Sequence, residues 1–301
     1  MKNHLLGVAA ALFLISCNAG SGKDSTPSST VKPTDSSSSS KPQTGATPVA
    51  TGSKADAATI MGRKQVPILC YHHIRPIQMA SRANKGYEVT VQQFKDQMKV
   101  LADSGYHSIT PDEYYNYLVY GASLPEKPVM ITFDDTSEEH FTIAKPEMEK
   151  YGFKGVYFIM TISINRPRYM TTEQIKELSD AGHIIASHTW DHHRVDKYIV
   201  GDRTIQDGKK QKTFNDWDVQ LAGSKKKLEE ITGKPVEYFA YPFGIWSKPG
   251  IPEIEKRGYK MAYQLSTVRD SLQPLFTARR MIVSPEWSAP GMVKVMKSTF
   301  K

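Results

Sequence analysis

The stretch Pro128–Asp135 (PVMITFDD) decides how this chain folds, because it joins a buried strand to a pair of acidic side chains. Val129–Phe133 is a short apolar run behind a proline, which is the pattern of a buried strand. Successive side chains of a strand point to opposite sides, so Asp134 and Asp135 cannot both lie in one packed core. Burial of a carboxylate without a partner is costly, and a metal ion or a hydrogen-bond network is the usual compensation.

A second polar cluster follows another apolar run further along the chain. His183–Ala186 (HIIA) predicts a strand, and Ser187–His193 (SHTWDHH) comes directly after it. An isolated pair of aspartates is more typical of a helix N-cap or an exposed turn. The two clusters together favour a shared site, because consecutive strands of an α/β barrel end at the same face.

Strand-like and helix-like segments alternate along most of the chain, which favours a parallel sheet. We therefore expect a deformed (β/α) barrel of about seven strands, formed by a single catalytic domain. Residues 198–215 lack periodicity and predict a surface loop. The expected strands are 66–71, 106–109, 129–133, 155–160, 183–186, 236–240, 259–263 and 281–283, and the expected helices are 91–104, 110–120, one ending near 151–152, 171–181 and 216–232.

The amino-terminal residues predict export and a tether. Residues 1–16 carry a basic start and an apolar segment too short to span a bilayer, as in a secretory signal peptide. Leu14–Cys17 (LISC) resembles a lipobox, which implies that Cys17 is lipidated; the alternative is an ordinary signal peptide with a chance cysteine. Residues 17–62 are rich in Ser, Thr and Pro and predict a flexible linker ahead of a domain at 63–301. The expected location is extracytoplasmic, lipid-anchored to a membrane.

The composition limits the partners that we expect. The chain has 39 Lys and Arg against 31 Asp and Glu, a net charge of +8, and no long basic block, which argues against nucleic-acid binding. After lipidation only Cys70 remains, so no disulfide forms within the domain. Cys70 lies in an apolar run and is expected to be a small buried hydrophobic residue. The oligomeric state stays open.

The histidine cluster contains a candidate metal-binding pair. His188 and His192 are four residues apart and would share one face of a helical turn. With one carboxylate they give a two-histidine, one-carboxylate set that suits zinc, although other divalent ions accept the same donors. An isolated pair with this spacing is often a surface feature, so the prediction depends on the nearby aspartates.

Three motifs resemble those of the polysaccharide deacetylases of carbohydrate esterase family 4, zinc-dependent enzymes that remove N- or O-acetyl groups from sugars. The motifs are TFDD at 132–135, HTWDH at 188–192 and YPFG at 241–244. The resemblance implies that Asp134 is the catalytic base and that Asp135, His188 and His192 hold the metal. It also implies that the third motif shapes the substrate groove and offers a backbone N–H to the oxyanion, through Tyr241, Pro242 and Phe243.

The general acid is less directly indicated. Most members of the family have a histidine near the carboxyl end, whereas this chain has none after His193. Ile68–Ile74 (ILCYHHI) resembles the displaced strand of a circularly permuted branch that includes poly-N-acetylglucosamine deacetylases. This resemblance implies that His72 is the acid, with a hydrogen-bonded histidine at a strand end as the alternative and His73 as a second choice.

Two positions depart from the family pattern. Thr136 follows the aspartate pair where the family usually has glycine, and Ala240 stands where an arginine often restrains the base. Arg279 or Arg280 could replace that arginine from a neighbouring strand, and surface placement is the alternative.

The motifs together predict a metal-dependent hydrolase that removes N-acetyl groups from N-acetylglucosamine residues of a cell-envelope or extracellular polysaccharide. The alternatives are a deacetylase of peptidoglycan or of O-acetylated glycans, and a non-catalytic glycan-binding lipoprotein of the same fold. Thr136, Ala240 and the uncertain acid favour the non-catalytic alternative.

Overall fold

Parallel strands form one sheet, and the helices of the domain pack around it. The computed structural model describes residues 53–76, 86–197, 205–207, 210–212 and 217–300. The order of strands in the sheet is β13-β1-β5-β6-β7-β10-β11-β12, and β4 pairs with β5. The strands are β1 (Ile68–Tyr71), β4 (His107–Ser108), β5 (Pro128–Asp134), β6 (Gly155–Ile159), β7 (Ile184–Ser187), β10 (Tyr238–Ala240), β11 (Met261–Gln264), β12 (Ala278–Arg279) and β13 (Met281–Ile282).

The two edges of this sheet are consecutive parts of one chain segment. β12 pairs with β11 and β13 pairs with β1, and Arg280 alone separates β12 from β13. The Arg280 N–H donates to the Gln264 carbonyl oxygen at 3.0 Å, which ties the bend to β11. The sheet therefore curls into a nearly closed barrel. The predicted deformed barrel of about seven strands is confirmed, with the β12–β13 segment counted as one strand.

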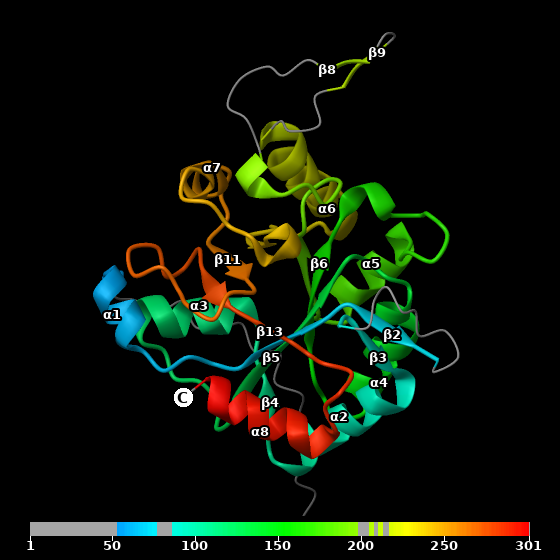
Figure 1. Ribbon diagram of the computed structural model, residues 1–301, viewed down its shortest axis with the longest axis vertical. Helices are drawn as coiled ribbons and strands as arrows, with labels where there is room; N and C mark the ends of the chain where they lie inside the picture. Colours follow the sequence, from blue (N-terminus) through cyan, green and yellow to red (C-terminus); the bar gives the residue numbers. More distant parts are fainter. Residues whose placement is uncertain (1–52, 77–85, 198–204, 208–209, 213–216, 301) are drawn as a thin grey trace, which may run out of the picture. The chain divides into compact units, whose positions relative to one another are not determined.

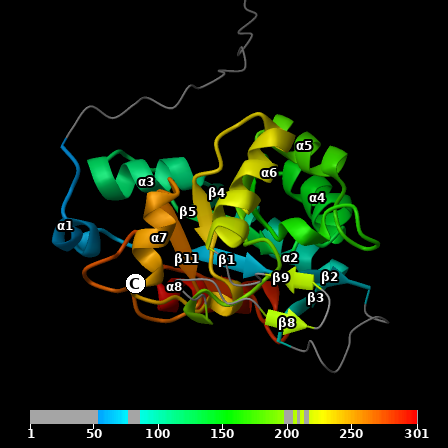
Figure 2. The same ribbon diagram turned by 90° about the horizontal axis from the view of Figure 1, so that it is seen from above.

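Helices surround this barrel (Figures 1 and 2). Three of them begin with a Thr-x-x-Gln or Thr-x-x-Glu capping box, at Thr90, Thr110 and Thr171, which satisfies amide groups that a helix start leaves free. The helices are α1 (Ala57–Gly62), α2 (Val91–Asp103), α3 (Pro111–Tyr120), α4 (Lys145–Glu149), α5 (Thr172–Asp180), α6 (Ser224–Thr232), α7 (Gly250–Lys256) and α8 (Ala289–Thr299). None of the helices in the described ranges is long and apolar enough to cross a membrane.

The β5 strand shows how the core is divided. Val129, Ile131 and Phe133 pack in the cluster between the sheet and the helices, whereas Met130 packs in the cluster that includes the barrel interior. This alternation follows from the two-residue period of a strand. Because both faces are covered, apolar residues occupy both sides of the strand, and its polar residues Thr132 and Asp134 are buried near its carboxyl end. The same alternation directs Asp134 into the barrel interior.

Some segments differ from the sequence predictions. Within the predicted linker, α1 is a helix: Asp56 caps it by accepting from the Thr59 N–H at 2.8 Å, and Ile60 is buried. The folded part therefore begins before residue 63.

The predicted loop at 198–215 contains an antiparallel pair, β8 (Ile205–Asp207) and β9 (Lys210–Lys212). The small parallel pair β2 (His73–Arg75) and β3 (Glu88–Thr90) and the helices α7 and α8 were not predicted. The predicted signal peptide, Cys17 and most of the linker lie outside the described residues.

A buried histidine makes the stability of the domain depend on pH. The His183 side chain is almost fully buried, and its Nδ1 accepts from the Gly155 N–H at 3.0 Å. Burial, together with the charge of Lys154, lowers the pKa of His183 from 6.5 to about 4, although Glu149 acts in the opposite direction. The unfolded chain therefore binds this proton more readily than the folded protein does.

We expect His183 to make the free energy of unfolding fall by up to about 1.4 kcal/mol per pH unit as the pH drops from about 6.5 to about 4. In His183→Asn this contribution should disappear, because the amide oxygen can accept from Gly155 without titrating. Urea unfolding at several pH values between these limits measures the slope. The exposed His107→Asn variant is the control and should keep the wild-type slope. Equal slopes in His183→Asn and the wild type would contradict the prediction.

Candidate metal centre and active site

The chain turns sharply where β5 ends. Asp134 is the last residue of the strand and is buried, while Asp135 and Thr136 have φ values of 74° and 66°. A β-branched residue with positive φ is uncommon. Thr136 is held there by its surroundings: its Oγ1 accepts from the Met160 N–H at 2.8 Å, and its carbonyl oxygen accepts from the Met170 N–H at 3.0 Å. These bonds stabilise the turn at a position where the family resemblance predicts glycine.

The two histidines of the second motif lie on a turn after β7. His188 follows the strand directly, and Thr189 and His192 have φ values of 69° and 66°. The expectation that His188 and His192 share one face of a helical turn is therefore wrong. The turn is closed by the Thr189 Oγ1, which accepts from the His192 N–H at 2.9 Å. It still brings the two imidazole rings together, with their centroids 4.8 Å apart.

The structure brings Asp135, His188 and His192 to one point. The Asp135 Oδ1 lies 3.5 Å from the His188 Nε2 and 3.4 Å from the His192 Nε2. Ligand atoms about 2.0–2.1 Å from a tetrahedral ion are about 3.3–3.4 Å apart, so this spacing suits a shared cation. The Asp135 Oδ1 is buried and accepts no hydrogen bond from any residue in the described ranges. Such an atom needs a cation or another donor.

Neighbouring groups prepare these ligands for a cation. The His188 Nδ1 lies 2.8 Å from the Ala240 carbonyl oxygen and so carries the hydrogen, which leaves the Nε2 lone pair facing Asp135. Burial opposes ionisation of Asp135, but the nearby His188 holds the pKa of this carboxyl well below its usual range. Burial, with the nearby His188, lowers the pKa of His192 to about 4. The residues present therefore fit a divalent metal ion.

Asp134 is held by a buried arginine. The Arg280 Nη1 and Nη2 donate to the Asp134 Oδ1 and Oδ2 at 2.6 and 2.7 Å, and both residues are buried. Although burial raises the pKa of Asp134, Arg280 and then His188 lower it more, to about 2. The sequence left Arg279 and Arg280 as alternatives for this role. The structure places Arg280 at the base, whereas Arg279 packs over the Phe300 ring at 5.2 Å.

His72 stands beside Asp134, with Cys70 between them. In the parallel register Tyr71 faces Phe133, so Asp134, the last residue of β5, lies next to His72, which directly follows β1. The Cys70 Sγ lies 3.8 Å from the His72 Nδ1 and 3.7 Å from the Asp134 Oδ2. Burial lowers the pKa of His72, although both aspartates act against this.

Cys70, His72 and Asp134 also have the donor types of a metal site, and their donor atoms lie within 4.8 Å of one another. Both Asp134 oxygens already accept from Arg280, so this group does not provide a second site. The sequence predicts a buried hydrophobic role for Cys70, and the structure adds its contact with Asp134. The available signal was that residues two apart share one face of a strand.

His73, the second choice for the acid, faces a different set of groups. Its Nδ1 lies 3.2 Å from the Glu139 Oε1 and 3.0 Å from the Ser137 Oγ. These contacts fasten β2 to the segment that follows the aspartate turn. They make His73 part of the scaffold around the site.

The third motif forms one wall of the site. Phe243 has a φ of 60°, is 59% exposed, and its ring centroid is 4.5 Å from that of His192. Tyr241 and Pro242 are buried, and the Tyr241 hydroxyl donates to the Phe276 carbonyl oxygen at 3.0 Å. The turn itself uses the amides of Gly244 and Ile245, which donate to the carbonyl oxygens of Tyr241 and Pro242. The Phe243 N–H is not consumed by these bonds.

The contribution of the Arg280–Asp134 ion pair to the free energy of unfolding can be tested. Arg280→Met should lower the free energy of unfolding by about 3–5 kcal/mol, because it leaves a buried carboxylate without its partner. Adding Asp134→Asn to this variant should recover part of the loss, since no charge then stays buried. Denaturant unfolding of the single and double variants measures the coupling. Arg279→Met is the matched control, and an equal loss in both single arginine variants would refute the assignment.

Comparisons with known proteins agree with this geometry. Residues 121–262 match the sequence pattern of the family described as polysaccharide deacetylase. A Bacillus subtilis (strain 168) protein described as a polysaccharide deacetylase is 29% identical over 237 residues, which cover 78% of this chain and 77% of that protein. A poly-beta-1,6-N-acetyl-D-glucosamine N-deacetylase of Staphylococcus aureus (strain MRSA252) is 26% identical over 212 residues, which cover 65% of this chain and 71% of that protein.

A solved structure shares the fold. The Streptococcus pyogenes deacetylase PplD, solved in complex with acetate, superposes with a TM-score of 0.67 at 22% identity and covers 77% of this chain and 98% of its own. The matched family span contains the aspartate pair, both histidines and the YPFG turn. Sequence, fold and site therefore agree that residues 121–262 form a polysaccharide deacetylase domain.

Proposed function

We propose that this enzyme removes N-acetyl groups from N-acetylglucosamine residues of an extracellular or cell-envelope polysaccharide, with zinc as its metal. The observation that carries the proposal is the position of Asp135, His188 and His192 beside a second carboxylate, Asp134, whose orientation Arg280 fixes. One carboxylate is thereby free to bind a cation and the other to move a proton.

Each residue has a place in the hydrolysis. When bound, the cation polarises the acetyl carbonyl and lowers the pKa of water next to it. Asp134 is ionised at neutral pH and accepts the proton of the attacking water. The Phe243 N–H donates to the oxyanion that develops on the acetyl group. His72, which directly follows the neighbouring strand β1, gives a proton to the departing amine nitrogen.

Zinc is the proposed ion because of its ligands. Two imidazole nitrogens and one carboxylate oxygen, with an open position for water, form a common catalytic zinc set. Other divalent ions accept the same donors, so the metal content of the purified protein distinguishes them.

Exposed aromatic rings support a sugar polymer as the substrate. Phe243 lies next to His192, and Tyr87, which is 48% exposed, has its ring centroid 5.1 Å from that of His72. Their apolar faces are open to solvent and suit the flat faces of sugar rings. The S. aureus relative acts, by its name, on poly-beta-1,6-N-acetyl-D-glucosamine, which makes this polymer the first substrate to test.

The alternative of a non-catalytic glycan-binding protein is less well supported. Thr136 and Ala240 were two of the features that favoured it, and the structure shows how each departure from the family pattern is accommodated. Thr136 is stabilised in its turn by hydrogen bonds with Met160 and Met170, both beyond β6. Arg280 binds Asp134 in place of the arginine that Ala240 replaces. Deacetylation of peptidoglycan or of an O-acetylated glycan remains the alternative within the family.

Two readouts separate the base from the metal ligands. Asp134→Asn should keep about one cation per chain and lose acetate release at least about 100-fold, because no group then accepts the proton. His188→Ala should lose both the cation and the activity. The exposed Asp180→Asn is the control and should keep both. Elemental analysis and acetate release from poly-N-acetylglucosamine, chitooligosaccharide, peptidoglycan and acetylxylan provide the measurements. Unchanged release in Asp134→Asn, or full activity without metal, would overturn the assignment.

We also propose that the enzyme acts outside the cytoplasm, anchored to a membrane by lipid on Cys17 after removal of residues 1–16. The support is the LISC sequence and the Ser, Thr and Pro-rich segment behind it. In cells grown with labelled palmitate, the native protein should carry the label and sediment with membranes. Cys17→Ala should lose both properties. An unlabelled native protein would exclude lipid anchoring.

A further inference from the structure

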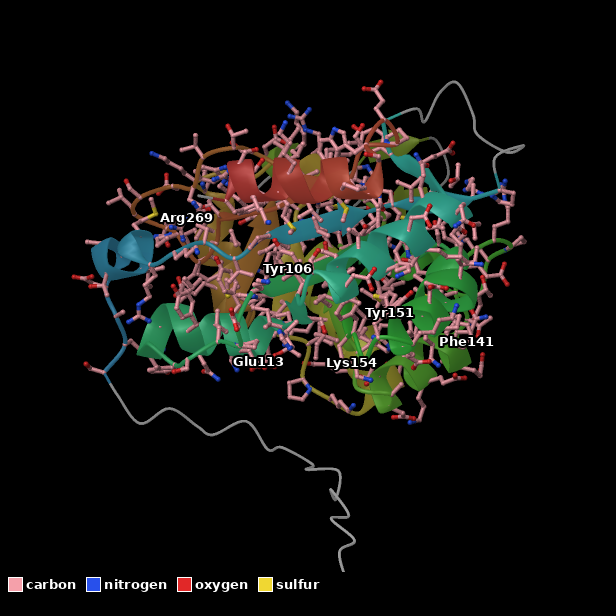
Figure 3. The ribbon with its side chains drawn as sticks, turned by 90° about the horizontal axis from the view of Figure 1, so that it is seen from below. Tyr106, Glu113, Phe141, Tyr151, Lys154 and Arg269 are labelled. Atoms are coloured by element: carbon pink, nitrogen blue, oxygen red, sulfur yellow. The ribbon has the colours of Figure 1, made fainter. Side chains whose placement is uncertain are left out.

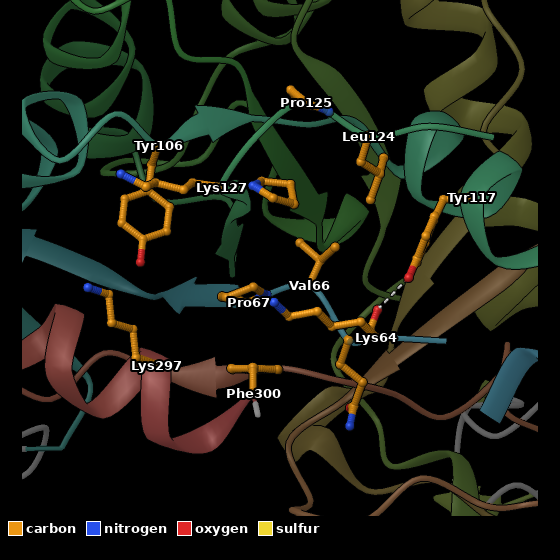
Figure 4. A pocket seen from close by; sticks show the side chains of 12 residues that line it. Lys64, Val66, Pro67, Tyr106, Tyr117, Leu124, Pro125, Lys127, Lys297 and Phe300 are labelled. Carbon is orange, nitrogen blue, oxygen red and sulfur yellow. Dashed lines mark hydrogen bonds between the residues drawn. The ribbon is translucent and has the colours of Figure 1, made fainter. Parts of the chain in front are cut away.

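A second cavity lies at the opposite end of the barrel from the metal centre. Val66 and Pro67, just before β1, and Pro128, the first residue of β5, are part of its wall. The catalytic side chains lie at the other ends of β5 and β7, and these strands are parallel. The cavity has a volume of about 570 Å³, within the range of small-molecule sites. Figure 4 shows its lining.

The cavity combines apolar walls with a basic rim. Leu124 and Phe300 contribute to the walls, and Lys64, Lys127 and Lys297 line it with exposed side chains. None of its twelve lining residues is acidic. No carboxylate of the described part of the chain forms an ion pair with any of the three lysines. The Lys127 Nζ donates only to the Ser104 carbonyl oxygen, at 2.9 Å.

A tyrosine hydroxyl group also faces this space. Tyr106 is 8% exposed, and its hydroxyl makes no hydrogen bond with the residues that the structure describes. Figure 4 shows the Tyr106 ring on the same side of the cavity as Lys297, with its hydroxyl directed into the open space. Burial raises the pKa of Tyr106, so the hydroxyl keeps its hydrogen. The cavity thus offers a neutral donor as well as ammonium groups.

One guanidinium group lies behind the wall, and a second lies close to the first. Arg279 donates to the Gln65 Oε1 at 3.4 Å and covers the Phe300 ring, and both Gln65 and Phe300 line the cavity. Arg269 is buried against α1, where its Nη2 donates to the Met61 carbonyl oxygen at 3.1 Å (Figure 3). Both have a buried Nε without a hydrogen-bond partner among the described residues, and neither forms an ion pair there.

These groups create an uncompensated positive potential. Burial, and then the charge of Arg269, lowers the pKa of Arg279, as expected for two close cations. Apolar walls of low dielectric concentrate such a potential in a cavity. Bringing like charges together costs free energy, and an anion would offset that cost. The apolar walls favour a hydrocarbon part in the same ligand.

We propose that this cavity binds an amphipathic anion, with a carboxylate or phosphate head at Lys64, Lys127 and Lys297 and a short hydrocarbon chain against Leu124 and Phe300. The Tyr106 hydroxyl donates to the same head group. The proposal does not depend on the deacetylase activity, because the cavity shares no residue with the metal centre.

Calorimetric titration of the full chain tests both parts of the ligand. Decanoate and decyl phosphate should bind in a saturable way. Inorganic phosphate, which lacks the chain, and decanol, which lacks the charge, should each bind at least about tenfold more weakly. Decyltrimethylammonium has the chain with the opposite charge and should not bind. Equal binding of the cationic and anionic amphiphiles would overturn the proposal.

Variants at the rim place the ligand in this cavity. Lys64→Glu and Lys297→Glu should each raise the Kd for decanoate at least about tenfold, because a like charge then faces the head group. The exposed Lys95→Glu on α2 is the matched control and should leave the Kd unchanged. Tyr106→Phe should weaken binding without changing the cavity volume. Wild-type acetate release in the rim variants shows that they fold. An equal Kd in Lys297→Glu and Lys95→Glu would exclude this site.

Vesicles distinguish the source of the anion. If phosphatidylglycerol vesicles bind the protein and decanoate displaces them, the head group comes from a membrane lipid. If decanoate binds and the vesicles do not, the ligand is a soluble amphiphile. A third outcome would contradict the proposal: the vesicles bind, but decanoate neither binds the protein nor displaces them. Vesicle binding would then arise from surface charge alone.

Discussion

The buried ion pair between Arg280 and Asp134 connects the architecture to the chemistry. Arg280 separates β12 from β13, so it lies where the two edges of the sheet meet. The same side chain engages both oxygens of Asp134 from within the barrel. A buried carboxylate without a partner would be strongly destabilising, so the closure of the sheet and the ionisation of the base support each other. Arg280 also removes Asp134 from competition for a cation, which leaves that role to Asp135.

The division of labour between two adjacent aspartates depends on backbone conformation. Asp134 ends a regular strand and faces the interior, whereas Asp135 has a left-handed conformation and faces the histidines. Among the described residues, eight other than glycine have positive φ, and five of them belong to the site: Asp135, Thr136, Thr189, His192 and Phe243. Such conformations persist where the surrounding structure enforces them. Here the ends of parallel strands supply that framework.

The two ends of the barrel have opposite electrostatic character. At the carboxyl ends of the strands, carboxylates and imidazoles converge on a point suited to a cation. At the amino ends, lysines surround a cavity that no acidic residue lines, with Arg279 behind its wall. A parallel sheet makes this separation simple, because every strand contributes its first residues to one end and its last residues to the other. A ligand at one end need not disturb the other.

Much of this molecule follows from local sequence. The apolar runs predicted the strands, Thr-x-x-Gln and Thr-x-x-Glu predicted three helix starts, and the aspartate and histidine motifs indicated the candidate ligand set, because these patterns act within a few residues. Tertiary structure alone decided which arginine reaches Asp134, how the His188–His192 turn is shaped, and that Cys70 contacts the base. It also decided that α1 belongs to the folded part and that the basic residues of distant segments surround one cavity. The physical reason is that, apart from the His188–His192 turn, these contacts join residues tens to hundreds of positions apart. Their meeting depends on strand register and barrel closure, and no local pattern encodes either.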